Sequence, residues 1–118
     1  MTSQKKSELD VVLRRLNRND PRLADLSLSW IECGDFGADL LAHALKVNVI
    51  LRELDLYHND IGPQGASSLA RSLETNSTLM SLNLDMNNIG DEGANEFLHV
   101  LRRHNTSLTK LTLANNHV

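Results

Sequence analysis

Two carboxylates and an imidazole, from Asp55, Asp85 and His58, are the side chains of this sequence whose types suit metal binding or proton transfer. They come from two separate stretches of the chain that carry similar patterns of leucine. A metal ion also requires a fixed ligand geometry, which sequence spacing does not define. The sequence therefore predicts no metal site.

Covalent catalysis has one thiol candidate, because Cys33 is the only cysteine. Cys33 occupies the position that Ile61 and Ile89 fill in the later, similar stretches, so we expect it in the apolar core. There is no GxSxG motif, no P-loop and no GxGxxG after a predicted strand. We therefore predict that the protein is not an enzyme and uses no cofactor.

The remaining chemistry is recognition. Aromatic side chains are common anchors of protein interfaces, and clustered carboxylates favour a partner with a basic surface. The predicted protein-binding residues are Asp25, Trp30, Glu53, Asp55, Tyr57, His58, Asn83, Asp85 and Met86. For Trp30 the alternative is burial beneath an N-terminal helix, and for Tyr57 and His58 it is ordinary solvated surface.

These residues are embedded in an internal repeat. An LxxLxL pattern begins at Leu23 and returns at Leu51 and Leu79, at two equal intervals of 28 residues. A fourth, partial unit begins at Leu108, one residue later than this interval requires. Each of the first three units is one supersecondary element, repeated along the chain.

Each unit divides into a strand and a helix. Leu54 and Leu56 are two residues apart and share one face of an extended chain, opposite Glu53, Asp55 and Tyr57. The following apolar residues have helical spacing. The predicted helical stripes are Ala38, Leu41, Ala42 and Leu45; Ala66, Leu69, Ala70 and Leu73; and Ala94, Phe97, Leu98 and Leu101.

Neither half of a unit can bury its apolar face alone, so successive units must stack. The predicted fold is an α/β solenoid, a right-handed βα superhelix with a parallel sheet on the concave face and helices on the convex face. The outward strand positions, including all the predicted binding residues, then line the concave face. Trp30 and Tyr57 would stand on adjacent strands, about 4.8 Å apart.

The turns that follow the strands carry asparagine and glycine. Asn59, Asn87 and Asn116 are predicted to be buried and to bond backbone groups that the bend leaves unpaired. Gly62 and Gly90 are predicted to occupy turns that require a positive φ.

The pattern LxxLxLxxNxIGxxGAxxLAxxL, complete in residues 51–73, resembles the leucine-rich repeat of the ribonuclease-inhibitor type. The resemblance extends over residues 23–118. Proteins of this type include ribonuclease inhibitor, NOD-like receptors, the GTPase-activating protein for Ran, tropomodulin and leiomodin. What they share is the binding of a protein on the curved surface, so the resemblance implies the same here.

Residues 1–22 precede the repeats and are predicted to form a capping helix and a turn, with Ser7 and Asp10 as a capping box. The helix leads through Asn19-Asp20-Pro21, which resembles the start of the tropomodulin repeat domain. Pro21 also disfavours a helical conformation at Asp20, so the turn is equally what a helix-to-strand corner requires. The predicted domains are therefore 1–22 and 23–118.

Charge is uneven along the chain. Residues 1–22 carry six basic and three acidic side chains, whereas the whole chain has a net charge of −3. A basic segment is compatible with an acidic partner such as nucleic acid or lipid, but no aromatic residues alternate with these charges. We interpret it as a solvated helix face and predict no nucleic-acid partner.

Location follows from what the sequence lacks. The N-terminus has no apolar signal region, and no apolar run is long enough to span a bilayer. A single cysteine also excludes an internal disulfide framework. We predict no membrane association and a cytoplasmic location, with the nucleus as the alternative.

The partial fourth unit would expose an apolar face and a sheet edge, which natural folds avoid. Two explanations are open: the chain is a fragment of a longer array, or two copies associate edge to edge.

The predicted function is a non-catalytic protein-interaction module that binds its partner on the concave face. One alternative is a filament-capping or regulatory protein of the tropomodulin-like type, with the basic N-terminal segment as a second contact. Another is a GTPase-activating repeat protein, for which fold analogy is the only support.

Overall fold

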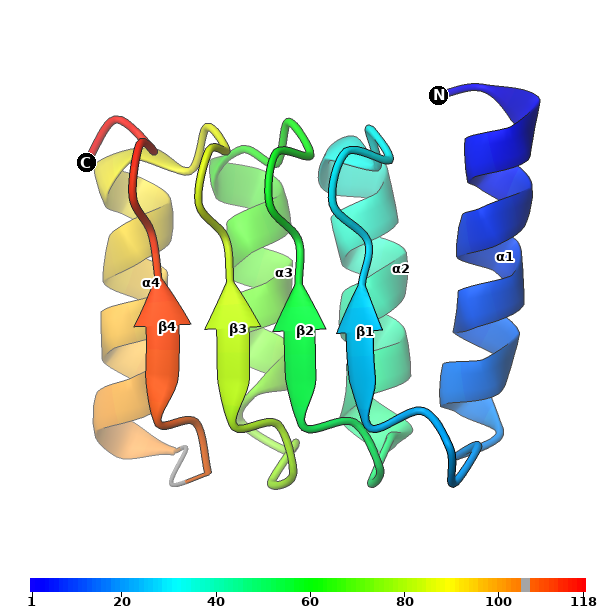
Figure 1. Ribbon diagram of the computed structural model, residues 1–118. Helices are drawn as coiled ribbons and strands as arrows, with labels where there is room; N and C mark the ends of the chain where they lie inside the picture. The colour runs from blue at the N-terminus through cyan, green and yellow to red at the C-terminus, as the bar shows by residue number, and fades with distance from the viewer. Residues whose placement is uncertain (105–106) are drawn as a thin grey trace.

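A computed structural model describes residues 1–104 and 107–118. An N-terminal helix leads into a regular alternation of strands and helices (Figure 1). The elements are α1 (Ser3–Asn17), β1 (Asp25–Ser27), α2 (Gly34–Val47), β2 (Glu53–Asp55), α3 (Pro63–Ser72), β3 (Ser81–Asn83), α4 (Gly90–Arg103) and β4 (Lys110–Thr112).

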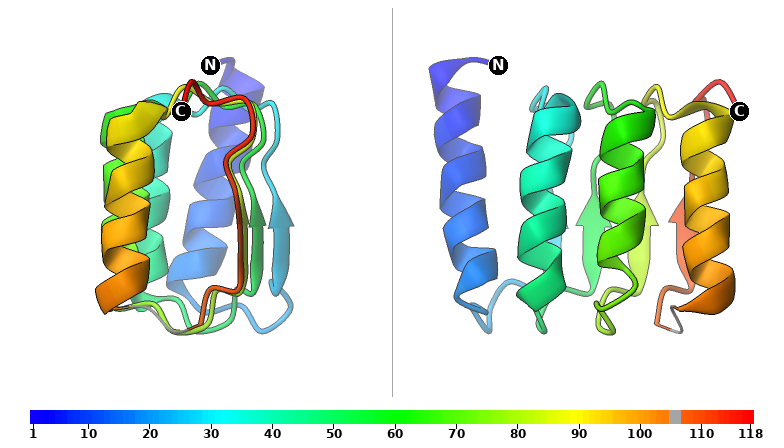
Figure 2. Two further views of the ribbon diagram at one scale, coloured as in Figure 1. Left: turned by 90° about the vertical axis from the view of Figure 1, so that its left-hand side faces the viewer. Right: turned by 180° about the vertical axis from the view of Figure 1, so that it is seen from behind.

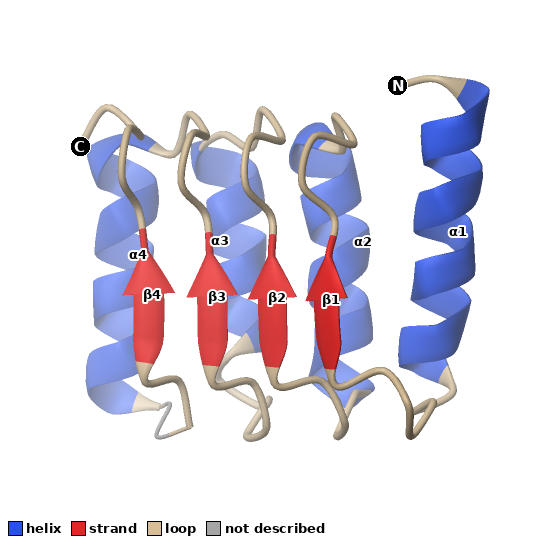
Figure 3. Cartoon of the chain, viewed as in Figure 1, coloured by secondary structure: helices blue, strands red, loops and turns tan. Residues whose placement is uncertain are grey.

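The strands form one parallel sheet in the order β1-β2-β3-β4, and helices α2, α3 and α4 lie side by side behind it (Figures 1 and 2). Each unit rises through its strand, crosses to the helix layer and returns downward, so the coil advances with a right-handed sense. Figure 3 shows the two layers by colour, strands in front and helices behind. The predicted α/β repeat solenoid is confirmed.

Strand register follows the sequence period. Leu26 pairs with Leu54 and Leu54 with Leu82, at the interval of 28 residues, whereas Leu82 pairs with Leu111. The last step is one residue longer, as the late start of the fourth unit predicts. Identical positions of successive units therefore stand beside one another across the sheet.

The core lies between the sheet and the helices. Leu54, Leu56 and Leu82 from the strand side are at most 2% exposed, as are Leu69 of α3 and Leu73 at its C-cap. Each fully buried leucine contributes roughly 1.5–3 kcal/mol of transfer free energy. The first two predicted helical stripes are buried throughout.

The third predicted stripe is partly wrong. Leu98 is 56% exposed, whereas Val100, outside the predicted stripe, is fully buried. Leu98 stands where Ala42 and Ala70 stand in the earlier helices, and each of those helices packs against the next one. No further helix packs on α4 within the described residues, so the side chain at this position meets solvent.

Helix α1 lies beside α2 at the β1 end of the array and buries Leu9, Val12 and Leu16. The predicted capping box is wrong, because the helix begins four residues before Ser7. Its N-cap is Thr2, whose hydroxyl accepts a hydrogen bond from the Lys5 backbone at 3.2 Å. Residues 3–6 are polar and carry no apolar signal that could place the first turn.

Candidate binding surface on the exposed face of the sheet

The exposed face of the sheet is hollowed into a groove of about 550 Å³ to which all four strands contribute. We call this surface the groove. Its lining residues are Asp25, Leu26, Ser27, Glu53, Leu54, Asp55, Ser81, Asn83, Asp85, Lys110 and Thr112. Five of the predicted binding residues lie here: Asp25, Glu53, Asp55, Asn83 and Asp85.

The groove is acidic at its β1 and β2 side. Asp25 pairs in register with Glu53, so two exposed carboxylates are neighbours on adjacent strands. None of the four groove carboxylates forms an ion pair in the part of the chain that the structure describes. Lys110 lies at the opposite, β4 side. A concave surface lined by one sign of charge concentrates its field on the opposite charge.

Two of the carboxylates also shape the backbone. One oxygen of Asp55 accepts a hydrogen bond from the Tyr57 backbone at 3.0 Å, and the other accepts from the Ser27 hydroxyl at 3.3 Å. Asp85 accepts from the Ala114 backbone at 2.8 Å. These carboxylates are held in place, whereas Asp25 and Glu53 are exposed.

An aromatic cluster stands at one rim of the groove, beyond the carboxyl ends of β1 and β2. We call Trp30, Tyr57 and His58 the rim cluster. The rings of Trp30 and His58 are stacked, with centroids 3.6 Å apart and planes 19° apart. The Tyr57 ring lies tilted, 6.0 Å from Trp30 and 6.3 Å from His58. Trp30 is 55% exposed.

The cluster corrects two sequence expectations. Trp30 and Tyr57 do not lie on paired strand positions, because β1 ends at Ser27 and β2 at Asp55. Burial of Trp30 beneath the N-terminal helix is also excluded by its exposure. The physical reason is a left-handed backbone: φ is +63° at Trp30, +52° at His58 and +60° at Met86, which ends the extended chain.

Backbone hydrogen bonds fix this turn in each unit. The Trp30 N–H donates to the Tyr57 carbonyl and the His58 N–H donates to the Asp85 carbonyl, both at 3.1 Å. Met86 donates to the Ala114 carbonyl in the same way, and its side chain is 38% exposed. Trp30, His58 and Met86 therefore stand in one row along the rim.

Behind the rim, buried asparagines join successive units. The Asn59 side chain donates to the Leu28 carbonyl at 2.9 Å and accepts from the Cys33 backbone at 3.2 Å. Asn87 does the same one unit later for Leu56 and Ile61, and Asn116 also donates to the Leu84 carbonyl. Each amide satisfies backbone groups of the preceding unit.

The two predicted turn glycines differ. Gly90 has a φ of +70°, whereas Gly62 has a φ of −98°, so the positive φ expected at Gly62 is wrong. Pro63 follows Gly62 and favours an extended conformation there. The Gly62 N–H donates a hydrogen bond to the Asp35 carboxylate at 2.7 Å.

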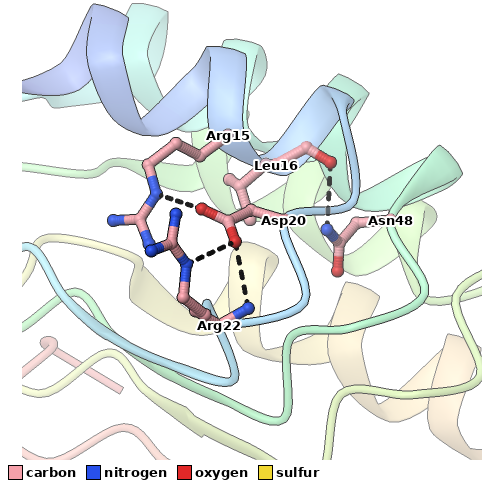
Figure 4. Close-up of polar contacts among 5 residues, drawn as sticks. All are labelled: Arg15, Leu16, Asp20, Arg22 and Asn48. Atoms are coloured by element: carbon pink, nitrogen blue, oxygen red, sulfur yellow. Dashed lines mark hydrogen bonds and ion pairs between the residues drawn. The ribbon is translucent and has the colours of Figure 1, made fainter.

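A second set of asparagines, at the opposite ends of the helices, is a feature that the sequence analysis missed. Asn48 donates to the Leu16 carbonyl at 3.0 Å (Figure 4). Its side-chain oxygen accepts from the Leu51 backbone at 2.7 Å. Asn76 repeats this with Leu45 and Leu79. The interval from Asn48 to Asn76 is the period of the leucines and could have revealed them.

The basic N-terminal segment is partly neutralised within the chain. Asp20 accepts hydrogen bonds from the Arg22 backbone at 3.0 Å and from Arg15 at 2.8 Å (Figure 4). These two interactions, the Arg22 backbone first, lower the pKa of Asp20 from 3.8 to about 2. Lys5 pairs with Glu32 at 2.6 Å. Arg14 and Arg18 remain exposed on α1 and its C-cap.

Further features that bear on function are the thiol of Cys33, possible metal ligands and possible membrane-spanning helices. Cys33 is 4% exposed, and burial raises the pKa of its thiol to about 12. The described residues contain no group of three or more histidine, cysteine or acidic side chains arranged to hold a metal ion. No helix in the described ranges has the length and apolar character needed to cross a membrane.

Comparisons with known proteins agree with this architecture. A family described as "Leucine Rich repeat" matches residues 47–70 and 75–98. No curated protein sequence matches the chain. Among solved structures, "Leiomodin-1 Actin-Binding Site 2 (ABS2)" is 27% identical with a TM-score of 0.87, and the match covers 93% of this chain and 64% of that one.

The tropomodulin C-terminal domain of Caenorhabditis elegans is 18% identical with a TM-score of 0.82, over 92% of this chain and 65% of that one. The chain thus spans less than two thirds of the length of both proteins, and the tropomodulin likeness concerns the fold alone. The repeat-family matches, the structural likenesses and the regular strand–helix units identify the chain as a leucine-rich repeat protein of the ribonuclease-inhibitor-like type.

Proposed function

We propose that this chain is a non-catalytic protein-interaction module and that its partner binds in the groove through a basic surface. The observation that carries the proposal is the set of four groove carboxylates without a cationic partner among the described residues. The rim cluster adds an exposed aromatic surface at the groove's edge. Under this proposal residues 23–118 form the binding array and residues 1–22 cap its first unit.

The pairing of Asp25 with Glu53 supports a functional rather than a structural role for these charges. Like charges directly opposite on neighbouring strands repel each other and destabilise a sheet. Among the described residues neither side chain forms a hydrogen bond that would offset this cost, and both are exposed. Such a pair is favourable when a cationic partner supplies the missing charge.

A second candidate is binding to actin, as part of a filament-capping or regulatory protein of the tropomodulin-like type. The observation that favours it is the likeness to a leiomodin structure whose title names an actin-binding site. In this version the exposed Arg14 and Arg18 of the N-terminal segment provide a second contact. An actin partner would also place the chain in the cytoplasm. GTPase activation has no specific observation in its favour.

Binding assays with purified actin and with cell extract test both candidates. The groove variant combines Asp25→Lys with Glu53→Lys, the N-terminal variant combines Arg14→Glu with Arg18→Glu, and Glu74→Lys is a charge control at an exposed site after α3. The groove proposal predicts that only the groove variant loses the partner. Retention by the groove variant would overturn it, and loss by the N-terminal variant alone would favour the second contact instead.

Self-association must be measured in the same experiments, because β4 is an edge strand of the sheet in the described residues. An exposed edge is a template for pairing with another chain. Sedimentation velocity of the unbound protein over a range of concentrations tests edge-to-edge pairing. A molecular mass that stays monomeric throughout would exclude it.

A further inference from the structure

We infer that the rim cluster is an arginine-binding subsite, in which a guanidinium group of the protein partner stacks on the open face of Trp30. This inference rests on the proposed function and specifies which partner side chain the rim accepts. It assigns different tasks to the two parts of the surface. The groove attracts positive charge of any kind, and the rim cluster selects arginine.

The first observation is the exposure of the only tryptophan in the chain. Trp30 is 55% exposed although aromatic residues make up only 3% of the sequence. The stacked imidazole of His58 covers one face of the indole, and Tyr57 lies beside it. Stacking on one side leaves the other face of the ring available to a flat ligand group.

The second observation is that the backbone of the cluster is fixed in one conformation before a ligand binds. Bulky residues rarely adopt a positive φ, yet Trp30 does so at +63°. The Trp30 and His58 backbones are fixed by hydrogen bonds to the next unit, and the Asn59 side chain donates to the Tyr57 carbonyl at 3.2 Å. The same positive φ recurs at His58 and Met86, so the turn belongs to the repeat scaffold, and the scaffold fixes the backbone of the cluster.

The third observation is the charge that continues from the rim into the groove. Asp55 precedes Tyr57 by two residues and bonds its backbone N–H, so a carboxylate lies at the base of the cluster. Aromatic faces and carboxylates together attract cations and repel phosphate groups. The surface therefore suits a basic protein segment and not a nucleic acid.

Arginine fits this arrangement better than lysine. Its guanidinium is planar, weakly hydrated and able to stack on an aromatic face while its edge donates to a carboxylate. A lysine ammonium is a strongly hydrated point charge that gains little from a flat surface. A whole exposed cation–π contact is worth about two- to five-fold in dissociation constant, and because lysine also makes such contacts, though less often, this is the upper limit of the preference.

Trp30 itself reports on the subsite, because its fluorescence is the only tryptophan signal of the protein. The probes are three short peptides in which alanine alternates with arginine, lysine or glutamate. We expect saturable changes in Trp30 emission with the arginine peptide, binding of the lysine peptide that is weaker by up to about five-fold, and no change with the glutamate peptide. Equal affinity for arginine and lysine, or no response to arginine, would overturn the inference.

Variants separate stacking from charge. Trp30→Leu, followed by calorimetry, should abolish the preference for arginine over lysine, and His58→Ala should reduce it. Glu53→Gln should weaken both peptides equally and leave the preference intact. Phe36→Leu is the matched control, since Phe36 is an exposed aromatic residue in the first turn of α2. Circular dichroism and the unfolding midpoint establish that each variant is folded.

The outcomes also distinguish this inference from the proposed function. Partner loss in the Asp25→Lys, Glu53→Lys variant, together with equal peptide affinities in the wild type, would retain the groove and reject the arginine subsite. An arginine preference that survives in Trp30→Leu would likewise reject it. Partner binding that persists in the groove variant would reject the groove function, whatever the peptides show.

Discussion

Asp25 and Glu53 are register partners on β1 and β2, so two exposed carboxylates stand side by side on the same face of the sheet. Because their repulsion opposes folding, Glu53→Gln should raise the free energy of unfolding at low ionic strength, on the scale of roughly 0.2–1 kcal/mol that is typical of exposed charge pairs. High salt should reduce the gain by screening. Urea unfolding at low and high salt measures both effects.

The matched control for this substitution is Asp60→Asn, which removes an exposed charge outside the sheet at a left-handed position that asparagine tolerates. Equal gains from both substitutions would mean that net charge, and not the Asp25–Glu53 pair, determines the effect. If Glu53→Gln also weakens partner binding, the charge pair lowers the stability of the fold but strengthens recognition. Such a trade-off between stability and function is common at functional sites.

The repeated elements could be predicted from sequence because the same physical requirement recurs in every unit. Leu54 belongs to a strand pattern and Ala66 to a helix pattern, and each pattern can bury its apolar face in only one way. The period and spacing of the apolar residues were therefore sufficient to predict the sheet, the helices and the strand register. The prediction was wrong where a residue's surroundings differ between units. Leu98 occupies the position of Ala70 but lacks a following helix in the described chain.

The groove could be anticipated, since alternation along a strand places Glu53 and Asp55 opposite Leu54. The rim cluster could not. Stacking of Trp30 on His58 depends on a positive φ at both residues, and a bulky residue such as tryptophan does not signal such a backbone. Similarly, Gly62 is a residue that permits positive φ but is held extended before Pro63, next to the Asp35 carboxylate.

Asn87 is predicted to be the most sensitive polar residue of the turns. Its oxygen accepts from the Asn59 and Ile61 backbones, and its nitrogen donates to the Leu56 and Leu84 carbonyls. Asn87→Ala should lower the free energy of unfolding by about 2–4 kcal/mol, because each orphaned buried group costs about 1–3 kcal/mol. Chemical denaturation measures the loss.

Asn88→Ala is the control for Asn87→Ala, because Asn88 is exposed and its backbone bond to Ile61 does not involve the side chain. This variant should remain within about 0.5 kcal/mol of the wild type. Similar losses of unfolding free energy in the two variants would show that the buried asparagine side chains are not what stabilises the turns.

Asp20 should make the free energy of unfolding depend on pH under acidic conditions. Its folded pKa of about 2 lies below its ordinary value of 3.8, so the unfolded chain binds the proton more readily between these values. The stabilisation is therefore complete above the unfolded pKa and is lost as the pH falls through the folded value. Asp20→Asn should show a smaller acid destabilisation in this range.

Two measurements check the role of Asp20. Nuclear magnetic resonance titration should place the midpoint of its carboxyl group well below the ordinary value of 3.8, at about 2. Unfolding curves of the wild type and Asp20→Asn should converge as the pH decreases from 3.8 towards 2. A constant difference between the two proteins across this range would contradict the assignment.

Cys33 should be unreactive in the folded chain. Its thiol is buried and its pKa is raised to about 12, so very little thiolate is present near neutral pH. We expect alkylation to proceed only through opening of the first unit, and to become fast and complete in denaturant. Because there is no other cysteine, mass spectrometry counts the reaction at this site alone.

Gly37→Ala tests whether packing at the start of α2 controls access to Cys33. A Cβ atom at Gly37 would collide with the Cβ of Cys33 and come within 3.2 Å of its sulfur, so the helix start must shift. Overpacking of this kind typically costs about 1–3 kcal/mol, which predicts faster labelling of Cys33 under native conditions.

Gly34→Ala is the comparison, because a Cβ there meets no atom within 4 Å and only the positive φ is unfavourable. If both variants accelerate labelling equally, opening reflects the general stability of the unit. A selective effect of Gly37→Ala would establish that the contact between α2 and Cys33 is what keeps the thiol inaccessible.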